Sequence, residues 1–183
     1  MNERLVYVVG PSGAGKDSLL QWLQCHPPAH EALHLARRTV TRDIPGEAGT
    51  DEPIDTDSFE RLVLTGAFPL HWSANGCHYG IRAGQLAPME AGAWVLVSGS
   101  RGHLPQARLS HPGLTVVHVH ASPDVLARRL RARGRETEAE VQARLRRALA
   151  FEPPADALCL ANDHDLDSAG RRLRAMLVEP SLG

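Results

Sequence analysis

A glycine-rich loop near the start of the chain restricts the fold more than any other segment. Residues 10–16 read Gly-Pro-Ser-Gly-Ala-Gly-Lys and fit the pattern G-x-x-x-x-G-K, directly after the apolar run Leu5–Val9 and before a helical pattern at Asp17–Cys25. The glycines allow successive backbone N–H groups to turn toward phosphate oxygens, and the following helix N-terminus adds positive potential. The order of strand, loop and helix therefore predicts an α/β sheet that binds phosphate groups at this loop.

Lys16 is the only lysine among 20 basic residues, which indicates that this position needs a compact ammonium. We expect it to contact the β- and γ-phosphates. Where Ser or Thr normally follows this lysine and ligates Mg²⁺, the chain has Asp17 and then Ser18. A carboxylate beside a triphosphate requires a cation between them, so we expect Asp17 to ligate Mg²⁺ directly or through water. The alternative is that Asp17 only complements the helix N-terminus.

The remaining pattern alternates buried strands with helices. Strands are expected at Ala93–Val97, Leu114–Val119 and Ala157–Leu160, and helices at residues 122–130, 136–150 and 168–178. This alternation predicts a three-layer α/β fold with a mostly parallel sheet. The length of 183 residues favours one domain spanning residues 1–183. Residues 34–91 are less regular, and we interpret them as an inserted substrate-binding segment.

Composition narrows the class of protein. The net charge of −1 does not favour nucleic acid as a partner. The three cysteines lie far apart, without a C-x-x-C pair, and no signal peptide or run of about 18 apolar residues is present. We therefore expect a cytoplasmic protein without a membrane partner, and we assign no zinc to its histidines. Residues 43–60 hold seven acids and no base, which is typical of a solvated face.

A cluster of arginines predicts a basic lid at about residues 128–147. Residues 121–150 hold eight arginines against four acids, and the excess surrounds Arg133-Gly134-Arg135, where two expected helices meet. Part of this charge is ordinary helix stabilisation, as in the i,i+4 pair Glu140 and Arg144. Phosphoryl transfer needs cations around the transferred group and a way to exclude water, so we expect Arg133 and Arg144 to face phosphates.

Four segments together resemble the guanylate-kinase family of P-loop NTPase folds: GPSGAGKDS, RRTVTRDIPGE, HWSANGCHYG and RLRARGRETEAEVQARL. The resemblance implies ATP as the phosphoryl donor, an acceptor-binding segment at about residues 35–90, and a helical lid that closes over both. It also implies that Arg42 and Tyr79 hold the acceptor's phosphate, that Arg133 and Arg144 meet the transferring group, and that Asn162 touches ATP. The residues expected to contact ATP are Gly10, Pro11, Ser12, Gly13, Ala14, Gly15, Lys16, Asp17, Ser18 and Asn162.

The departures from guanylate kinases are systematic. The serine, glutamate and aspartate that read guanine there are absent near Arg38, near Leu70 or His71, and near Ser98 or Ser100, and a phosphate-binding tyrosine is absent near Asp51. Arg38, Ser98 and Arg101 supply guanidinium and hydroxyl groups instead, which suit a sugar phosphate.

The whole pattern, including GKDS and VLVSGSRGHLPQAR, resembles the ribose 1,5-bisphosphate phosphokinase family of bacterial phosphonate catabolism. That resemblance implies ribose 1,5-bisphosphate as the small-molecule acceptor, 5-phosphoribosyl 1-diphosphate as the product, and ATP with Mg²⁺. A nucleoside monophosphate kinase with an altered base pocket and a catalytically inactive binding module are the alternatives. The oligomeric state is left open, a homodimer included.

Overall fold

The structure is a computed structural model that describes residues 4–29, 31–42, 51–134 and 136–178. Arg135 of the expected lid and residues 43–50 of the acidic run lie outside the described residues. The chain forms two compact units. Unit 1 comprises residues 1–7 and 29–115, and unit 2 comprises residues 8–28 and 116–183.

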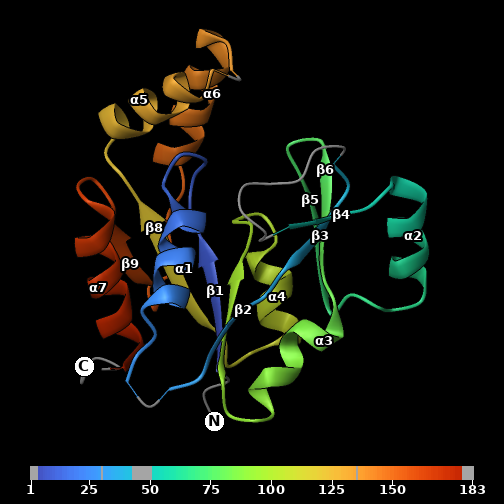
Figure 1. The fold of residues 1–183 in the computed structure, drawn as a ribbon. Coiled ribbons are helices and arrows are strands. Elements are labelled where there is room, and N and C mark those ends of the chain that lie inside the picture. Colours follow the sequence, from blue (N-terminus) through green and yellow to red (C-terminus); the bar gives the residue numbers. More distant parts are fainter. Residues whose placement is uncertain (1–3, 30, 43–50, 135, 179–183) are drawn as a thin grey trace. The chain divides into compact units, whose positions relative to one another are not determined.

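A five-stranded sheet has the order β2-β7-β1-β8-β9 (Figure 1). Strands β2 and β7 are parallel, as are β8 and β9. Strand β1 is fully buried, as expected for an apolar run in the middle of a sheet. The prediction of an α/β fold with a mostly parallel sheet is confirmed. The strands are β1 (Leu5–Val9), β2 (Leu33–Leu35), β7 (Trp94–Ser98), β8 (Thr115–His120) and β9 (Leu158–Ala161).

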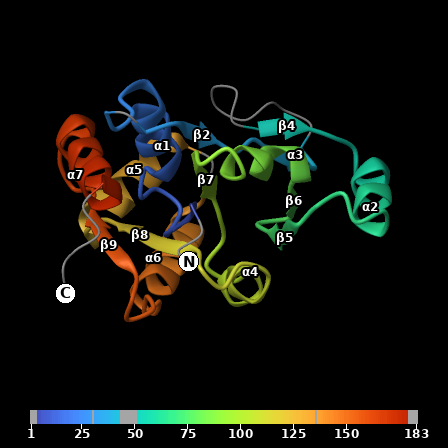
Figure 2. The same cartoon turned by 90° about the horizontal axis from the view of Figure 1, so that it is seen from below.

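Unit 2 contains four helices: α1 (Lys16–Cys25), α5 (Pro123–Arg133), α6 (Glu138–Leu149) and α7 (Leu166–Val178). Helices α1 and α7 lie side by side in both views (Figures 1 and 2). A hydrogen bond from Trp22 Nε1 to Asp167 Oδ1 (3.0 Å) joins them, and a side chain at Gly170 would overlap the Trp22 ring. Helices α5 and α6 pack against each other and correspond to the two helices expected in the lid, and their closing over a ligand stays a prediction.

Unit 1 contains a second sheet of four strands with the order β4-β3-β6-β5. The less regular sequence pattern of residues 34–91 did not indicate these strands individually. The antiparallel strands β5 and β6 are joined by Asn75 and Gly76, which both have positive φ, as a two-residue hairpin turn requires. The elements of this segment are β3 (Arg38–Val40), β4 (Asp51–Pro53), α2 (Thr56–Leu64), β5 (Leu70–Ala74), β6 (Cys77–Ile81), α3 (Ala83–Leu86) and the 3₁₀ helix η2 (Ala87–Met89).

The acidic run is also not a uniform solvated face. Asp51 is buried, Glu52 pairs with Arg82 (3.1 Å), and Asp55 caps helix α2 through the Ser58 backbone N–H (2.8 Å). The charges in the sequence did not by themselves distinguish these structural roles from simple exposure to solvent. Helix α4 (Leu104–Ser110) follows β7 and completes unit 1. Within the described residues, no helix is both long and apolar enough to cross a membrane.

Candidate functional site

The glycine-rich loop connects β1 to α1 in unit 2. Gly15 adopts φ 84° at the N-cap of α1 and has no side chain that could cap the helix. A Cβ on Gly10 would overlap the Val119 carbonyl oxygen, so only glycine fits there. The first backbone N–H groups of an uncapped helix lack intrahelical partners and can bind an anion. The loop therefore has the geometry of a phosphate-binding site.

Lys16 lies across the loop that precedes it. Its Nζ donates hydrogen bonds to the carbonyl oxygens of Gly10 (3.0 Å) and Pro11 (3.2 Å). The ammonium is thus already held beside the loop before any phosphate binds. Asp17 is half-buried and Ser18 is exposed on the first turn of α1. Carboxylate and hydroxyl oxygens are suitable Mg²⁺ ligands when nucleotide phosphates complete the coordination, so these residues fit the ion.

Asn162 is a buried residue that stabilises the loop through a hydrogen bond. It is 4% exposed, and its Nδ2 donates to the Ala14 carbonyl oxygen (2.7 Å). Its backbone N–H donates to the His120 carbonyl oxygen (2.8 Å), which places it at the end of β9. The expected contact between Asn162 and ATP stays a prediction, because the visible role of its amide is to fix the loop.

Asp163 fixes the start of the lid. Its Oδ1 accepts a hydrogen bond from the Ser122 backbone N–H (2.6 Å), next to the first turn of α5. This hydrogen bond lowers the pKa of Asp163, so the carboxylate stays charged at neutral pH. Ser122, followed by Pro123 and Asp124, has the sequence pattern of a helix N-cap. The structure places Ser122 there, but the stabilising acceptor is the Asp163 side chain.

Arg129 is a lid residue that the sequence reasoning did not select. Its Nη1 donates to the Gly13 carbonyl oxygen (3.4 Å), and burial lowers its pKa. It lies one helical turn before Arg133 in α5, so the two positions share a face of the helix. That i,i+4 spacing was the available signal. Arg129 reaches the loop itself, which makes it a candidate phosphate ligand.

Arg133 and Arg144 occupy different environments in the lid. Arg133 is exposed at the end of α5, where Gly134 ends the helix with φ 63°. Arg144 of α6 forms an ion pair with Glu136 (3.2 Å), whose side chain is 9% exposed. Glu140 completes a capping box with Thr137 at the start of α6. These hydrogen bonds and, to a smaller extent, the charge of Arg144 lower the pKa of Glu140, so the expected i,i+4 pair does interact through its charges.

In unit 1, four of the residues expected to bind the acceptor form one network around Asp51. Arg38 Nε donates to Asp51 Oδ1 (2.7 Å), and Arg38 Nη1 donates to Ser98 Oγ (3.1 Å). Arg42 Nη2 donates to the Tyr79 hydroxyl (3.1 Å), and Arg42 Nη1 lies 3.6 Å from Asp51 Oδ2. The structure thus brings four predicted residues together, from β3, β6, β7 and the residues just after β3. Their contacts with a ligand stay predictions.

Tyr79 of this network also belongs to a stack of aromatic rings. Trp72 is parallel to Tyr79, with ring centroids 5.6 Å apart, and also stacks on His103 at 5.3 Å. The Tyr7 hydroxyl bonds His103 Nδ1 (2.9 Å) and accepts the Ser100 N–H (3.2 Å). Burial raises the pKa of Tyr7 and lowers that of His103. Tyr7 thereby holds the turn after β7, which carries the half-buried Arg101.

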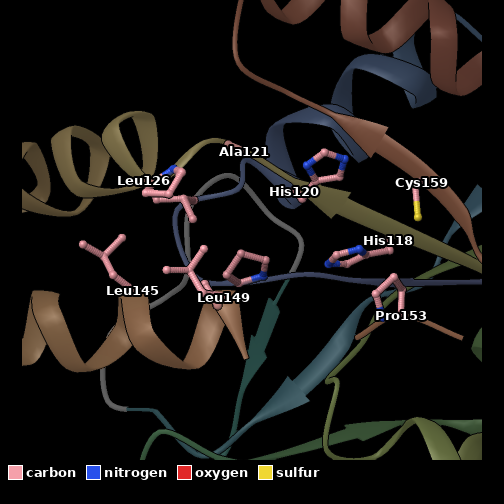
Figure 3. Close-up of a pocket in the computed structure, with 11 residues that line it drawn as sticks. His118, His120, Ala121, Leu126, Leu145, Leu149, Pro153 and Cys159 are labelled. Carbon is pink, nitrogen blue, oxygen red and sulfur yellow. The ribbon is translucent and has the colours of Figure 1, made fainter. Parts of the chain in front are cut away.

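A pocket of about 320 Å³ lies in unit 2, between the end of β8 and helix α6 (Figure 3). The stacked rings of His118 and His120 face the leucines of α6 across it (Figure 3). Its lining contains no lysine or arginine, so it does not suit a phosphate. Over the described ranges, no group of three or more His, Cys, Asp or Glu side chains is arranged to hold a metal ion. Pro11 of the glycine-rich loop also lines this pocket, but the pocket offers no cation to a phosphate.

Comparison with known proteins decides the family. The chain is 45% identical to a protein of Burkholderia mallei named ribose 1,5-bisphosphate phosphokinase PhnN, over 96% of this chain and 95% of that protein. The chain belongs to the ribose 1,5-bisphosphate phosphokinase PhnN family. A protein of the same name from Thiobacillus denitrificans is 41% identical over 96% of this chain and 93% of that protein. Another from Agrobacterium fabrum is 36% identical over 96% of this chain and 96% of that protein. No model of a protein family matches the sequence.

Two solved kinase structures are similar in fold to this PhnN-family chain. A guanylate kinase from Anaplasma phagocytophilum matches with a TM-score of 0.68 and 16% identity, over 98% of this chain and 86% of that one. A gluconokinase from Sinorhizobium meliloti matches with a TM-score of 0.53 and 20% identity, over 98% and 94%. At these identities the likeness is one of fold. It confirms the predicted guanylate-kinase-like P-loop fold.

Proposed function

We propose that this PhnN-family kinase transfers the γ-phosphoryl group of ATP to the 1-phosphate of ribose 1,5-bisphosphate. The products are 5-phosphoribosyl 1-diphosphate and ADP, within phosphonate catabolism. The observation that carries the proposal is 36–45% identity to phosphokinases of this name along nearly the whole chain. Two further features support it: an uncapped helix N-terminus behind a glycine loop, and an arginine network on a separate sheet.

The donor's phosphates would lie against the loop at residues 10–18. Lys16 would exchange its hydrogen bonds to the Gly10 and Pro11 carbonyls for bonds to the β- and γ-phosphate oxygens. The Lys16 ammonium would move only a short distance in this exchange, because those carbonyls belong to the loop that would surround the phosphates. Asn162 would keep the loop in shape during the exchange through its bond to Ala14.

The acceptor would bind to Arg38, Arg42, Tyr79, Ser98 and Arg101 of unit 1. A guanidinium can bond two phosphate oxygens at once, and a tyrosine hydroxyl adds a donor. The attacking oxygen of the 1-phosphate is ionised at neutral pH, so the reaction needs no strong general base. One P–O bond forms to the γ-phosphorus as the bond to the β-γ bridging oxygen breaks, and ADP leaves with that electron pair.

Charge neutralisation is then the main catalytic requirement. Lys16, Arg133 and Arg144 would surround the transferring group, and Arg144 would have to leave its ion pair with Glu136 or share it. Mg²⁺, held by Asp17 directly or through water, would neutralise the phosphates when bound. A doubly phosphorylated acceptor beside a triphosphate concentrates negative charge, which accounts for the abundance of arginine.

Replacing Asp17 tests its assignment to the metal. We expect Asp17→Ser to shift the Mg²⁺ concentration that gives half-maximal activity upward several-fold, while ATP affinity measured without metal changes little. Ser18→Ala is the matched control on the same helical turn. Loss of the Ser18 hydroxyl should raise the Mg²⁺ concentration for half-maximal activity less than loss of the Asp17 charge does. An unchanged Mg²⁺ titration in Asp17→Ser would leave the residue with a helix-dipole role only.

The function is tested by measuring ADP release with ribose 1,5-bisphosphate, with GMP and with no acceptor. We expect turnover with ribose 1,5-bisphosphate alone, together with phosphorus NMR signals of a new diphosphate in the product. Turnover with GMP alone would identify a nucleoside monophosphate kinase. The absence of turnover with either acceptor, in a protein that still binds ATP, would contradict enzymatic function.

A further inference from the structure

Asp51 is a buried carboxylate at the centre of the unit 1 network. It begins β4 and lies in register opposite Arg38 of the parallel strand β3. Its side chain is 5% exposed. A buried charge is retained only where opposite charges and hydrogen bonds compensate its desolvation. Asp51 meets this condition with two partners, Arg38 at 2.7 Å and Arg42 at 3.6 Å.

Both arginines are restrained at two points, and Asp51 is the partner that they share. Arg38 also donates hydrogen bonds to Ser98 at the end of β7, to its side-chain oxygen (3.1 Å) and its backbone carbonyl oxygen (3.5 Å). Arg42 also donates a hydrogen bond to the Tyr79 hydroxyl on β6 (3.1 Å). The Arg38 guanidinium also lies over the Tyr79 ring, 5.7 Å from its centroid. Asp51 therefore links side chains that come from three strands and the segment after β3.

This arrangement limits what Asp51 can do for a ligand. Its low exposure leaves little carboxylate surface for direct contact, and each oxygen faces a guanidinium. A long arginine side chain loses rotamer freedom when it binds a phosphate, and a restraint imposed before binding reduces that loss. A carboxylate between two guanidinium groups also offsets their mutual repulsion, which would otherwise separate them.

We propose that Asp51 is a positioning residue for the acceptor: its carboxylate holds Arg38 and Arg42 at the spacing that a pentose phosphate requires. The inference rests on the proposed function, because it concerns the acceptor of that reaction. Asp51 acts through the arginines and does not touch the substrate. It acts chiefly through Arg38, whose Nε forms the shorter contact.

A different role for Asp51 predicts the opposite sign. If the carboxylate only reduced the positive charge of the site, its removal would leave two uncompensated guanidinium groups and would tighten the binding of an anion. Positioning predicts weaker binding instead, because the arginines lose their shared anchor. The direction of the change in acceptor affinity thus separates the two roles without any assumption about its size.

The experiment measures the dissociation constant of ribose 1,5-bisphosphate by calorimetry, together with KM and kcat, in Asp51→Asn. Asparagine keeps the shape and removes the charge. We expect acceptor binding to weaken about tenfold or more, as for the loss of a charge-assisted hydrogen bond, with ATP affinity unchanged and the larger effect on KM. Glu52→Gln is the matched control, because Glu52 is the next residue of β4 and pairs with Arg82 at a 44% exposed side chain. Its acceptor affinity should stay within twofold of the wild type.

A double-mutant cycle tests whether Asp51 acts through Arg38. In an Arg38→Gln background, adding Asp51→Asn should weaken acceptor binding at least threefold less than it does in the wild type. An undiminished effect would mean that Asp51 does not act through Arg38 and would overturn the proposal, as would tighter or unchanged binding in the single variant. If Asp51→Asn alone does not fold, the acceptor affinity of Arg38→Gln is compared with that of the double variant, in which neither member of this pair is left as an unpaired buried charge. Similar affinities would support action through Arg38, and a much weaker affinity in the double variant would overturn it.

The wild-type measurement separates this inference from the proposed function. Wild-type protein that neither binds nor phosphorylates ribose 1,5-bisphosphate would contradict the proposed function itself. Wild-type protein that does both, with an Asp51→Asn variant of equal or higher acceptor affinity, would overturn only the positioning role.

Discussion

The phosphate loop of unit 2 and the arginine network of unit 1 are built in contrasting ways. The loop is made of consecutive residues whose backbone groups and glycines define its shape, with Asn162 and Lys16 bonded to its carbonyls. The network is made of side chains from β3, β4, β6 and β7 that meet only in the folded sheet. A loop of this kind can serve any nucleotide donor, whereas a side-chain network can be altered to suit a new acceptor.

The fold is shared with a guanylate kinase at 16% identity and with a gluconokinase at 20%. In this chain, the positions around Arg38, Asp51 and Ser98 form ion pairs and hydrogen bonds among themselves.

The largest expected difference between the regions comes from Lys16→Met. Methionine keeps the length of the side chain and removes its charge, so the developing charge on the transferred group loses one cation. We expect kcat to fall about 10²–10³-fold, measured as ADP release, with the calorimetric affinity for the acceptor unchanged. A kcat within tenfold of the wild type, in protein with a normal thermal midpoint, would exclude Lys16 from catalysis.

A smaller effect is expected from glycine substitutions in the two regions. Gly15 and Gly76 have similar φ values, 84° and 77°, so alanine at either position costs about 1–2 kcal/mol of backbone strain. Only at Gly15 does the added Cβ meet a neighbour, lying 2.5 Å from Asn162 Nδ2. We expect Gly15→Ala to lower the thermal midpoint more than Gly76→Ala does, and to weaken ATP binding, which Gly76→Ala should leave unchanged.

Equal losses of stability and normal ATP binding in both glycine variants would contradict this account of the loop. It would mean that the loop moves away from Asn162 without consequence, and that the hydrogen bond to Ala14 does not define its shape.

The smallest expected effect is a pH dependence confined to unit 1. Burial lowers the pKa of His103, so the folded state binds a proton there less readily than the unfolded state. Stability should therefore decrease as the pH falls below about 6.5, the ordinary pKa of histidine, until His103 is protonated in the folded state. The lowered pKa of Asp163 places the corresponding loss for unit 2 below about pH 4.

His103→Gln tests this expectation, because glutamine can still bond the Tyr7 hydroxyl but does not titrate. The decrease in thermal midpoint between pH 7 and pH 5 should be smaller in the variant than in the wild type. The nearby His71, whose charge also lowers the pKa of His103, is the control position: His71→Gln should change the dependence less. Identical pH profiles for wild type and His103→Gln would contradict the assignment.

The sequence predicted the loop better than the network, for physical reasons. Residues 10–18 have a local pattern, and β1 is found with the bounds predicted for it. Asn75-Gly76 is an equally local hairpin signal for β5 and β6, although no strand was predicted within residues 34–91. Asp51 had no local signal at all. Its role depends on the register of β3 and β4, which are joined through residues 43–50, so its neighbours in sequence do not indicate its partners.

Hydrogen exchange of the backbone amides, followed by mass spectrometry, tests the division between the two regions most directly. We predict that ribose 1,5-bisphosphate slows exchange in residues 38–42, 51–53 and 77–81 and leaves residues 10–18 unchanged, that MgATP has the opposite pattern, and that GMP protects neither. Protection of the unit 1 strands by GMP, equal to that by ribose 1,5-bisphosphate, would contradict a region built for a pentose phosphate.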